Sequence, residues 1–278
     1  IICLFIVIIM LLSVSIYADN EPTIYSEGAI LIEANTGTIL YEKNANEVFE
    51  PASTTKILTA LIALEKCDLN EVATASSTAI NGIPSNYAIA DIRVGEQFTI
   101  EQLLNVLLIH SANEAANVIA EYVAGSQEHF AELMNKRAKE LGCQNSNFVN
   151  ANGIENENHY TTAYDMAKIT QYALKNKKFV EVFDRYQYTS SDGQHQWVKK
   201  VIYKSKRDHI DTSMIEGCKS GYTSKAQSTL SSLLNINDHH YVCVVGFSKN
   251  SDGYNHCTVN DTLALGNYVK DHYSVANI

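Results

Sequence analysis

The order of hydrophobic patterns along the chain limits the folds that it can adopt. Two short β-rich runs, at 29–32 and 38–41, are separated by Asn35-Thr36-Gly37, which predicts a hairpin. Apolar residues then recur at helical spacing through the middle of the chain. The predicted helices run from Thr54 to Leu64, Thr99 to Leu108, Ala115 to Tyr122, Phe130 to Leu141 and Ala163 to Leu174.

Strand patterns return in the last third of the chain. Runs at 215–220, 228–234 and 241–247 are predicted strands, and Asn237-Asp238 joins the last two as a hairpin. An amphipathic helix is expected over 258–273. This order predicts an α/β fold in which both ends of the chain build one sheet. An all-helical subdomain, roughly residues 65–175, is inserted between them.

The charge of the chain excludes some classes of partner. The 278 residues carry a formal net charge of −10. Nucleic acids and anionic membrane surfaces are bound mainly through clustered Lys and Arg, so nucleic acid is not an expected partner. The densest basic stretch runs from Lys199 to Arg207, and we interpret it as a solvated strand or loop.

The first residues form a separate segment. Ile1 to Ile16 are almost wholly apolar, and Tyr17-Ala18 precedes the polar run Asp19-Asn20-Glu21. Residues 1–18 are therefore interpreted as a signal peptide cleaved after Ala18, or as an N-terminal membrane anchor. The sequence is expected to be truncated at its start, and residues 19–278 are expected to form one exported, extracytoplasmic domain.

Cysteine and histidine spacing does not predict a metal site. Cys3 lies in the export segment, and the five other cysteines are Cys67, Cys143, Cys218, Cys243 and Cys257. Their number is odd and their spacing suggests no disulfide framework, although one disulfide stays open for an exported protein. We expect thiols, no metal and no cofactor.

Ser53-Thr54-Thr55-Lys56 is the first motif with chemical meaning. Residues three apart on a helix share a face, with β-carbons about 5–6 Å apart. A serine hydroxyl needs a base to become nucleophilic, and Lys56 can serve only if its pKa is depressed. Ser53 is the only serine with a lysine three residues later. A helix-capping serine beside an exposed lysine is the alternative interpretation.

Two further motifs complete a set. Ser111-Ala112-Asn113 lies on a short loop between two predicted helices, where a rigid scaffold can hold its side chains. Lys219-Ser220-Gly221 lies in a predicted strand and is followed by Tyr222-Thr223. A glycine there lets a substrate backbone approach closely, and the cation and hydroxyl suit a carboxylate.

In this order the three motifs resemble the signatures of penicillin-recognising serine enzymes. The resemblance is closest to the D-Ala-D-Ala carboxypeptidases of peptidase family S11, the low-molecular-mass penicillin-binding proteins, and covers about Gly28 to Tyr273. Supporting motifs are Thr36-Gly37 with Leu40-Tyr41, Pro51-Ala52-Ser53, the run 148–153, the run 161–167 and Glu216-Gly217-Cys218. The resemblance implies a five-stranded antiparallel sheet flanked by helices, with the active site between the sheet and the helical subdomain.

The resemblance also implies roles for residues. Ser53 would attack the carbonyl between the two terminal D-alanines of a peptidoglycan stem peptide, and β-lactams would acylate the same serine. Lys56 would be the general base, and Ser111 with Lys219 would relay the proton to the leaving amine. Asn113 would hold the peptide backbone.

The remaining implied roles concern substrate binding. Ser220 and Thr223 would bind the terminal carboxylate, with Gly221 allowing close approach. The backbone N–H groups of Ser53 and Tyr222 would form the oxyanion hole, typically worth about 100- to 1000-fold per donor.

The chain departs from the family pattern at several positions. Ala112 stands where the family usually has Gly, and Gln227 stands where Gly usually follows the third motif. Lys249 is the nearest candidate for a basic residue that helps hold the carboxylate. Two alternative functions are a β-lactamase and a non-catalytic wall-binding homologue. The stretch 155–158 does not match the glutamate-containing loop that a class A β-lactamase needs.

Overall fold

The central element is one antiparallel sheet assembled from both ends of the chain. The computed structural model describes residues 21–248 and 256–273. The sheet has the order β2-β1-β9-β8-β7, and every neighbouring pair is antiparallel. Its strands are β1 (Ser26–Glu33), β2 (Ile39–Lys43), β7 (Ile215–Thr223), β8 (Gln227–Ile236) and β9 (His239–Ser248). The predicted fold class is confirmed.

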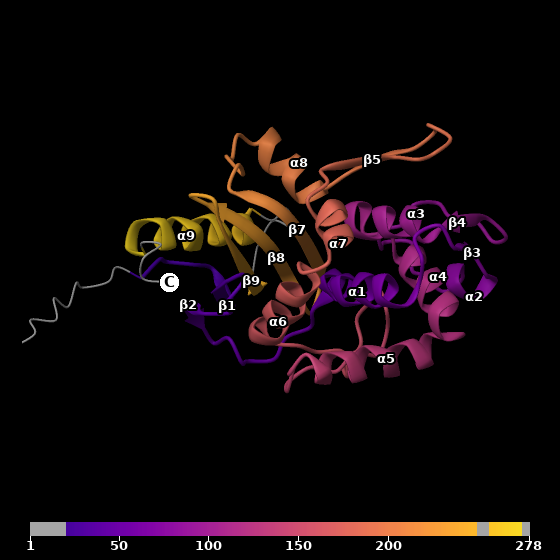
Figure 1. Cartoon of the computed structure of the whole chain (residues 1–278), viewed down its shortest axis with the longest axis horizontal. Coiled ribbons are helices and arrows are strands. Elements are labelled where there is room, and N and C mark those ends of the chain that lie inside the picture. Colours follow the sequence, from indigo (N-terminus) through magenta and orange to yellow (C-terminus); the bar gives the residue numbers. More distant parts are fainter. Residues whose placement is uncertain (1–20, 249–255, 274–278) are drawn as a thin grey trace, which may run out of the picture.

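Strand β9 shows why this sequence forms a sheet buried on both faces. Val242 and Val244 pack into one hydrophobic cluster, and Cys243 and Val245 pack into a second cluster on the opposite face. The two sets alternate because successive side chains of a strand point to opposite faces. Helix α9 (Cys257–His272) covers the second face, and α6 (Ala163–Ala173) packs on the first, with α1 (Lys56–Lys66) against α6 (Figure 1).

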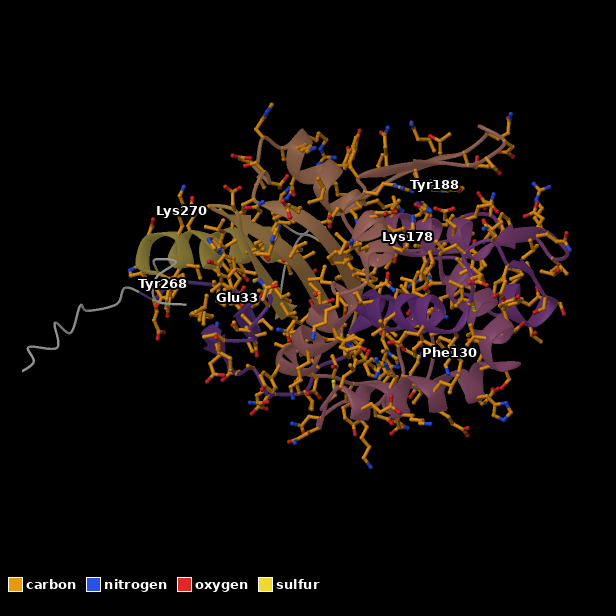
Figure 2. The ribbon with its side chains drawn as sticks, in the orientation of Figure 1. Glu33, Phe130, Lys178, Tyr188, Tyr268 and Lys270 are labelled. Carbon is orange, nitrogen blue, oxygen red and sulfur yellow. The ribbon has the colours of Figure 1, made fainter. Side chains whose placement is uncertain are left out.

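Most other helices gather on one side of the sheet (Figure 1). After the short turn η1 (Ala52–Thr55) and α1, this group contains α2 (Ser77–Ile80), α3 (Ile100–Asn105), the π-helical turn η2 (Val106–His110), α4 (Asn113–Ala124), α5 (Gln127–Glu140) and α7 (Lys177–Phe183). Phe130 of α5 is fully buried against the neighbouring helices (Figure 2). This group corresponds to the predicted helical middle of the chain.

Local sequence signals mark the ends of several helices in the structure. Thr99 and Gln102 form a reciprocal capping box at the start of α3. Ser126 caps α5, and Gly125 ends α4 in the left-handed conformation. The predicted hairpin turn at Asn237-Asp238 has positive φ at both residues, as a two-residue turn of this kind requires.

Small elements complete the molecule. Strands β3 (Val72–Thr74) and β4 (Gln97–Thr99) pair beside the helices, and β5 (Gln187–Thr189) pairs with β6 (Gln196–Val198) around a turn that contains Asp192 and Gly193. The Tyr188 ring stacks on Trp197 with ring centroids 6.1 Å apart. That hairpin projects beyond the helices (Figure 1).

One prediction was wrong. Residues 199–207 were expected to form a solvated strand or loop, but Lys200–Arg207 form helix α8 and Lys199 is buried. Ile202 of this helix packs into the second cluster, which supplies the burial that stabilises so short a helix. The basic stretch is therefore a packed element beside the sheet edge.

The proposed export segment and Lys249 lie outside the described residues. Within the part of the chain that is described, helices with the length and apolar character of a membrane span were not found.

Candidate active site

Ser53 is held where a helix begins. It lies in η1, directly before α1, and follows Pro51 and Ala52. Ala52 has a positive φ of 46°, a conformation that non-glycine residues adopt at a cost in energy. Ser53 lines a cavity of about 270 Å³, so its hydroxyl is accessible to a ligand.

The Lys56 amine is placed to act on that hydroxyl. Its Nζ lies 2.9 Å from Ser53 Oγ, and it donates to Asn113 Oδ1 at 2.8 Å and to the Asn152 carbonyl at 2.5 Å. A neutral lysine amine carries two N–H donors and one lone pair. The two oxygens of Asn113 and Asn152 only accept, so the lone pair is left for the Ser53 hydroxyl to donate to.

The surroundings of Lys56 favour this neutral form. The side chain is fully buried, and burial holds the pKa of its amine well below the ordinary lysine value. The positive charge of Lys219 lowers that pKa further, while the Glu114 carboxylate partly opposes the shift. A buried amine with a depressed pKa beside a serine is the arrangement that nucleophilic catalysis needs.

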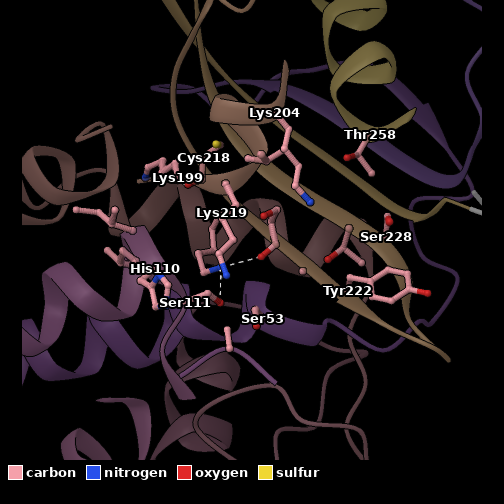
Figure 3. Close-up of a pocket in the computed structure, with 18 of the residues that line it drawn as sticks. Ser53, His110, Ser111, Lys199, Lys204, Cys218, Lys219, Tyr222, Ser228 and Thr258 are labelled. Carbon is pink, nitrogen blue, oxygen red and sulfur yellow. Dashed lines mark hydrogen bonds between the residues drawn. The ribbon is translucent and has the colours of Figure 1, made fainter. Parts of the chain in front are cut away.

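Ser111 and Lys219 form a second pair across the cavity. Ser111 sits between η2 and α4 with a left-handed φ of 69°. Lys219 Nζ donates to Ser111 Oγ at 3.0 Å and to the Ser220 carbonyl at 2.7 Å (Figure 3). Burial, followed by the charge of Lys199, lowers the pKa of Lys219 to about 7.

Asn113 links Lys56 to the segment that carries Ala88. Its Oδ1 accepts from Lys56, and its backbone N–H and Nδ2 both donate to the Ala88 carbonyl. Ala112, at the position where a glycine was expected, has an ordinary φ of −58°. The alanine therefore fits the backbone without strain.

Strand β7 brings the third motif against Ser53 along the outer edge of the sheet. A Cβ added to Gly221 would lie 2.8 Å from the Ser53 nitrogen, so only glycine allows this approach. Ser220, Gly221 and Tyr222 all line the cavity. Thr223 does not line it, and its hydroxyl accepts from the Ala226 N–H in the following turn.

Comparison with known proteins agrees with this geometry. A family model described as D-alanyl-D-alanine carboxypeptidase, peptidase S11, matches residues 16–249. The chain belongs to peptidase family S11. DacF of Bacillus subtilis (strain 168), a D-alanyl-D-alanine carboxypeptidase, is 34% identical over 210 residues, which cover 74% of this chain and 53% of DacF.

Solved structures show the same fold. The Streptomyces K15 DD-transpeptidase has a TM-score of 0.78 at 26% identity, with 89% of this chain and 97% of that chain covered. The D-alanyl-D-alanine carboxypeptidase of Mycobacterium tuberculosis H37Rv has a TM-score of 0.77 at 24% identity, with 89% and 92% covered. This S11 chain spans about half the length of the first curated relatives, 53% of DacF and 54% of Escherichia coli DacA.

Three residues that support the site in this S11 peptidase were not given roles from the sequence. Asn152 presents its carbonyl to Lys56, and its Nδ2 donates to Asn117 Oδ1 at 2.9 Å. Glu114 Oε1 accepts from the Ala90 N–H and so holds the loop that carries Ala88. Asn152 lies in the motif run 148–153, which was the available signal for it.

Lys199 is the third of these residues. Its amine is buried and donates to the Phe183 carbonyl at 2.5 Å and to the Cys218 carbonyl at 3.0 Å. Cys218 directly precedes Lys219, so the buried amine lies beside the motif lysine. No pattern in the sequence separates this lysine from the exposed ones around it.

Lys199 is expected to set part of the pH profile of this S11 peptidase. If Lys219 must be charged and Lys56 neutral, acylation rises with pH as Lys56 loses its proton and falls as Lys219 loses its proton near pH 7. In Lys199→Met a neighbouring positive charge is gone, so the pKa of Lys219 rises and the falling limb moves to higher pH. Acylation rates measured against pH test this, and an unmoved limb would contradict it.

Within residues 21–248 and 256–273, no group of three or more His, Cys, Asp or Glu side chains is placed to hold a metal ion.

Proposed function

We propose that this protein is a serine D-alanyl-D-alanine carboxypeptidase that acts on peptidoglycan stem peptides. The observation that carries the proposal is the Lys56 amine, which lies 2.9 Å from Ser53 Oγ while two fixed carbonyl oxygens take its N–H groups. The family membership and the names of its relatives support the same reaction.

Acylation would begin with the proton of Ser53. Lys56 accepts it as Ser53 Oγ bonds to the carbonyl carbon of the penultimate D-alanine. The backbone N–H groups of Ser53 and Tyr222 stabilise the resulting oxyanion. The C–N bond to the terminal D-alanine then breaks, and Ser111 with Lys219 delivers a proton to the leaving amine. An ester on Ser53 remains, and D-alanine leaves.

Water would complete the cycle by hydrolysing the ester and restoring the Ser53 hydroxyl. Asn113 would keep Lys56 in place throughout, through the hydrogen bond that its Oδ1 accepts. Ser220 and Gly221 form the wall along which the substrate backbone lies. A β-lactam follows the same acylation path, but its ring opens without releasing a leaving group, so it stays attached.

The assay is release of D-alanine from a peptide that ends in Lys-D-Ala-D-Ala. We expect wild-type protein to release one D-alanine per peptide and Ser53→Ala to release none. A wild-type protein that bound penicillin covalently but released no D-alanine would require a different peptide specificity, such as endopeptidase action on cross-links. One that did neither would be the non-catalytic homologue.

The composition of the cavity bears on the β-lactamase alternative. Aspartate and glutamate are absent from the described residues that line it. The Glu155 carboxylate instead accepts from the Ser224 hydroxyl and the Lys225 N–H. A class A β-lactamase needs a glutamate that activates the deacylating water. We therefore expect slow turnover of benzylpenicillin, and rapid repeated hydrolysis would overturn this part of the proposal.

The two names given to one relative suggest that an amine, rather than water, could accept the acyl group from Ser53. The Streptomyces sp. (strain K15) protein, 35% identical over 185 residues, is named a D-alanyl-D-alanine carboxypeptidase, and the K15 crystal structure is named a DD-transpeptidase. An amine in place of water would give transpeptidation. Adding a D-amino acid to the assay separates the two, since a transpeptidase would form the exchanged peptide.

We further propose that residues 1–18 export the chain, that residues 19–278 are the catalytic domain, and that residues 65–175 are its helical subdomain. The proposed substrate supports export, because peptidoglycan lies outside the cytoplasm. Sequencing the N-terminus of protein from the producing cells tests it. A start at Asp19 indicates a cleaved signal peptide, and an intact apolar segment indicates an anchor.

A further inference from the structure

A buried histidine lies beside the nucleophile and takes no part in the proposed mechanism. His159 is 1% exposed, and its ring lies edge-on to the Phe148 ring with centroids 5.6 Å apart. It is not among the described residues that line the catalytic cavity. Burial of a histidine is costly unless its ring nitrogens find hydrogen-bond partners. The partners of these nitrogens therefore indicate what the ring does.

The ring bridges two chain segments through its two nitrogens. The Val149 N–H donates to Nδ1 of His159 at 3.0 Å, so Nδ1 carries the lone pair. The proton of the neutral ring is then on Nε2, which lies 2.8 Å from Thr55 Oγ1 and donates to it. Thr55 directly precedes Lys56 in the chain. His159 therefore ties the turn that carries the nucleophile to the segment 148–153.

The bridged segment also carries the carbonyl that binds the proposed base. The Asn152 carbonyl accepts from Lys56 Nζ at 2.5 Å. The neighbouring Ala151 carbonyl accepts from Thr59 Oγ1 at 2.7 Å, about one turn further along α1. The bridge to Thr55 holds the segment on the other side of Lys56 along the chain. Contacts before and after the lysine therefore set where the carbonyl meets its amine.

We propose that His159 is a positioning residue that holds the Asn152 carbonyl on the Lys56 amine. The inference rests on the proposed acylation of Ser53, in which Lys56 is the base. While the N–H groups of the amine are held by fixed acceptors, its lone pair stays directed at the Ser53 hydroxyl. Without the bridge, the segment moves away from the turn, water reaches the amine, and the lone pair loses its direction.

The bridge requires a neutral imidazole ring. Burial, followed by the charge of Lys56, lowers the pKa of His159 from 6.5 to about 4. A charged ring would carry a proton on Nδ1, facing the Val149 N–H, and would bring a second positive charge close to Lys56. The other charged groups that face Lys56 are Lys219 from β7 and Glu114 from α4. The ring therefore stays neutral where Lys56 acts as a base.

The first test breaks the bridge from each end. Thr55→Val removes the hydroxyl and keeps the shape, whereas His159→Asn can keep the Val149 contact but is too short to reach Thr55. Each is expected to slow acylation by benzylpenicillin about 10- to 100-fold, because a misplacement of about 1 Å costs up to about 100-fold. The double variant should be no slower than either single variant, since both remove the same contact. Thr55→Ser retains the hydroxyl and should stay close to the wild-type rate.

The pH profile separates positioning from a loss of folding. Burial is the largest cause of the lowered pKa of Lys56, so water that enters a loosened site raises that pKa. The rising limb of acylation against pH should therefore move to higher pH in Thr55→Val and His159→Asn. Ser26→Ala is the matched control, because it also removes a buried side-chain hydrogen bond, to Asp261, outside the cavity. It should lower the melting temperature and leave the limb unmoved.

The outcomes distinguish this inference from the proposed function. Failure of the function appears in the wild-type protein itself, as no adduct on Ser53 and no released D-alanine. A folded Thr55→Val protein that acylates at the wild-type rate would overturn the role of His159, as would a slower rate with an unmoved rising limb. Additive losses in the double variant would show that the two side chains act independently. A nitrogen NMR spectrum that places the ring proton on Nδ1 would contradict the bridge.

Discussion

Replacing Lys56 with methionine is expected to slow acylation of Ser53 by benzylpenicillin about 10²- to 10⁴-fold, the range that a positioned general base contributes. Methionine fills similar space but cannot accept the serine proton. The Asn113 and Asn152 oxygens that receive the Lys56 N–H groups lose their donor, which costs about 1–3 kcal/mol for each buried group left without a partner.

The rate is measured by following formation of the covalent adduct with time. Lys66→Met is the matched control, because Lys66 is an exposed lysine at the other end of α1. Thermal melts of both variants separate loss of catalysis from loss of folding. A folded Lys56→Met protein that acylates at the wild-type rate would remove Lys56 as the base.

Gly153→Ala is expected to have an equally large effect through the backbone. An added Cβ would lie 1.8 Å from the Ala52 carbonyl oxygen and 3.0 Å from the Ser53 nitrogen, and Gly153 also has a φ of +82°. The segment before the nucleophile must therefore move. We expect at least a 100-fold loss of acylation, because the Ser53 N–H is a proposed oxyanion donor. Destabilisation of about 4 kcal/mol or more is expected as well.

Gly82→Ala provides the control for Gly153→Ala. Gly82 has a similar φ of +88°, but nothing lies within 4 Å of an added Cβ. It therefore carries the conformational cost, about 1–2 kcal/mol, without the collision. Equal losses of acylation and unfolding free energy in both variants would show that the contact with Ala52 has no special effect.

The fold could be predicted largely because its signals are local. Alternation in β9, the capping box at Thr99 and the turn at Asn237-Asp238 each act over a few residues. Helix α8 was missed for a physical reason. It is eight residues long, and it is stabilised by Ile202, which packs into a hydrophobic cluster with residues of the sheet and of α9, an arrangement that no local pattern reveals.

Features of the site that depend on neighbouring residues could be predicted from the sequence, and those that depend on distant segments could not. The motif spacing predicted that Ser53 and Lys56 lie close together, because residues three apart in a helical segment lie about one turn from each other. Other features of the site depend on chain segments far apart in the sequence. They are the burial of Lys199, the contact of the Asn152 carbonyl with Lys56, and the position of Lys204 on the cavity wall. Gln227 stands where the family usually has glycine, and its backbone has a φ of 53°. Glycine adopts this left-handed conformation most easily, which explains the family's preference for glycine at this position.

Intact mass after incubation with benzylpenicillin shows most directly whether Ser53 is the acylated nucleophile. We expect one stable adduct with the full mass of benzylpenicillin, mapped to the peptide that contains Ser53 and absent from Ser53→Ala. An adduct on another residue, or equal labelling of Ser53→Ala, would contradict it.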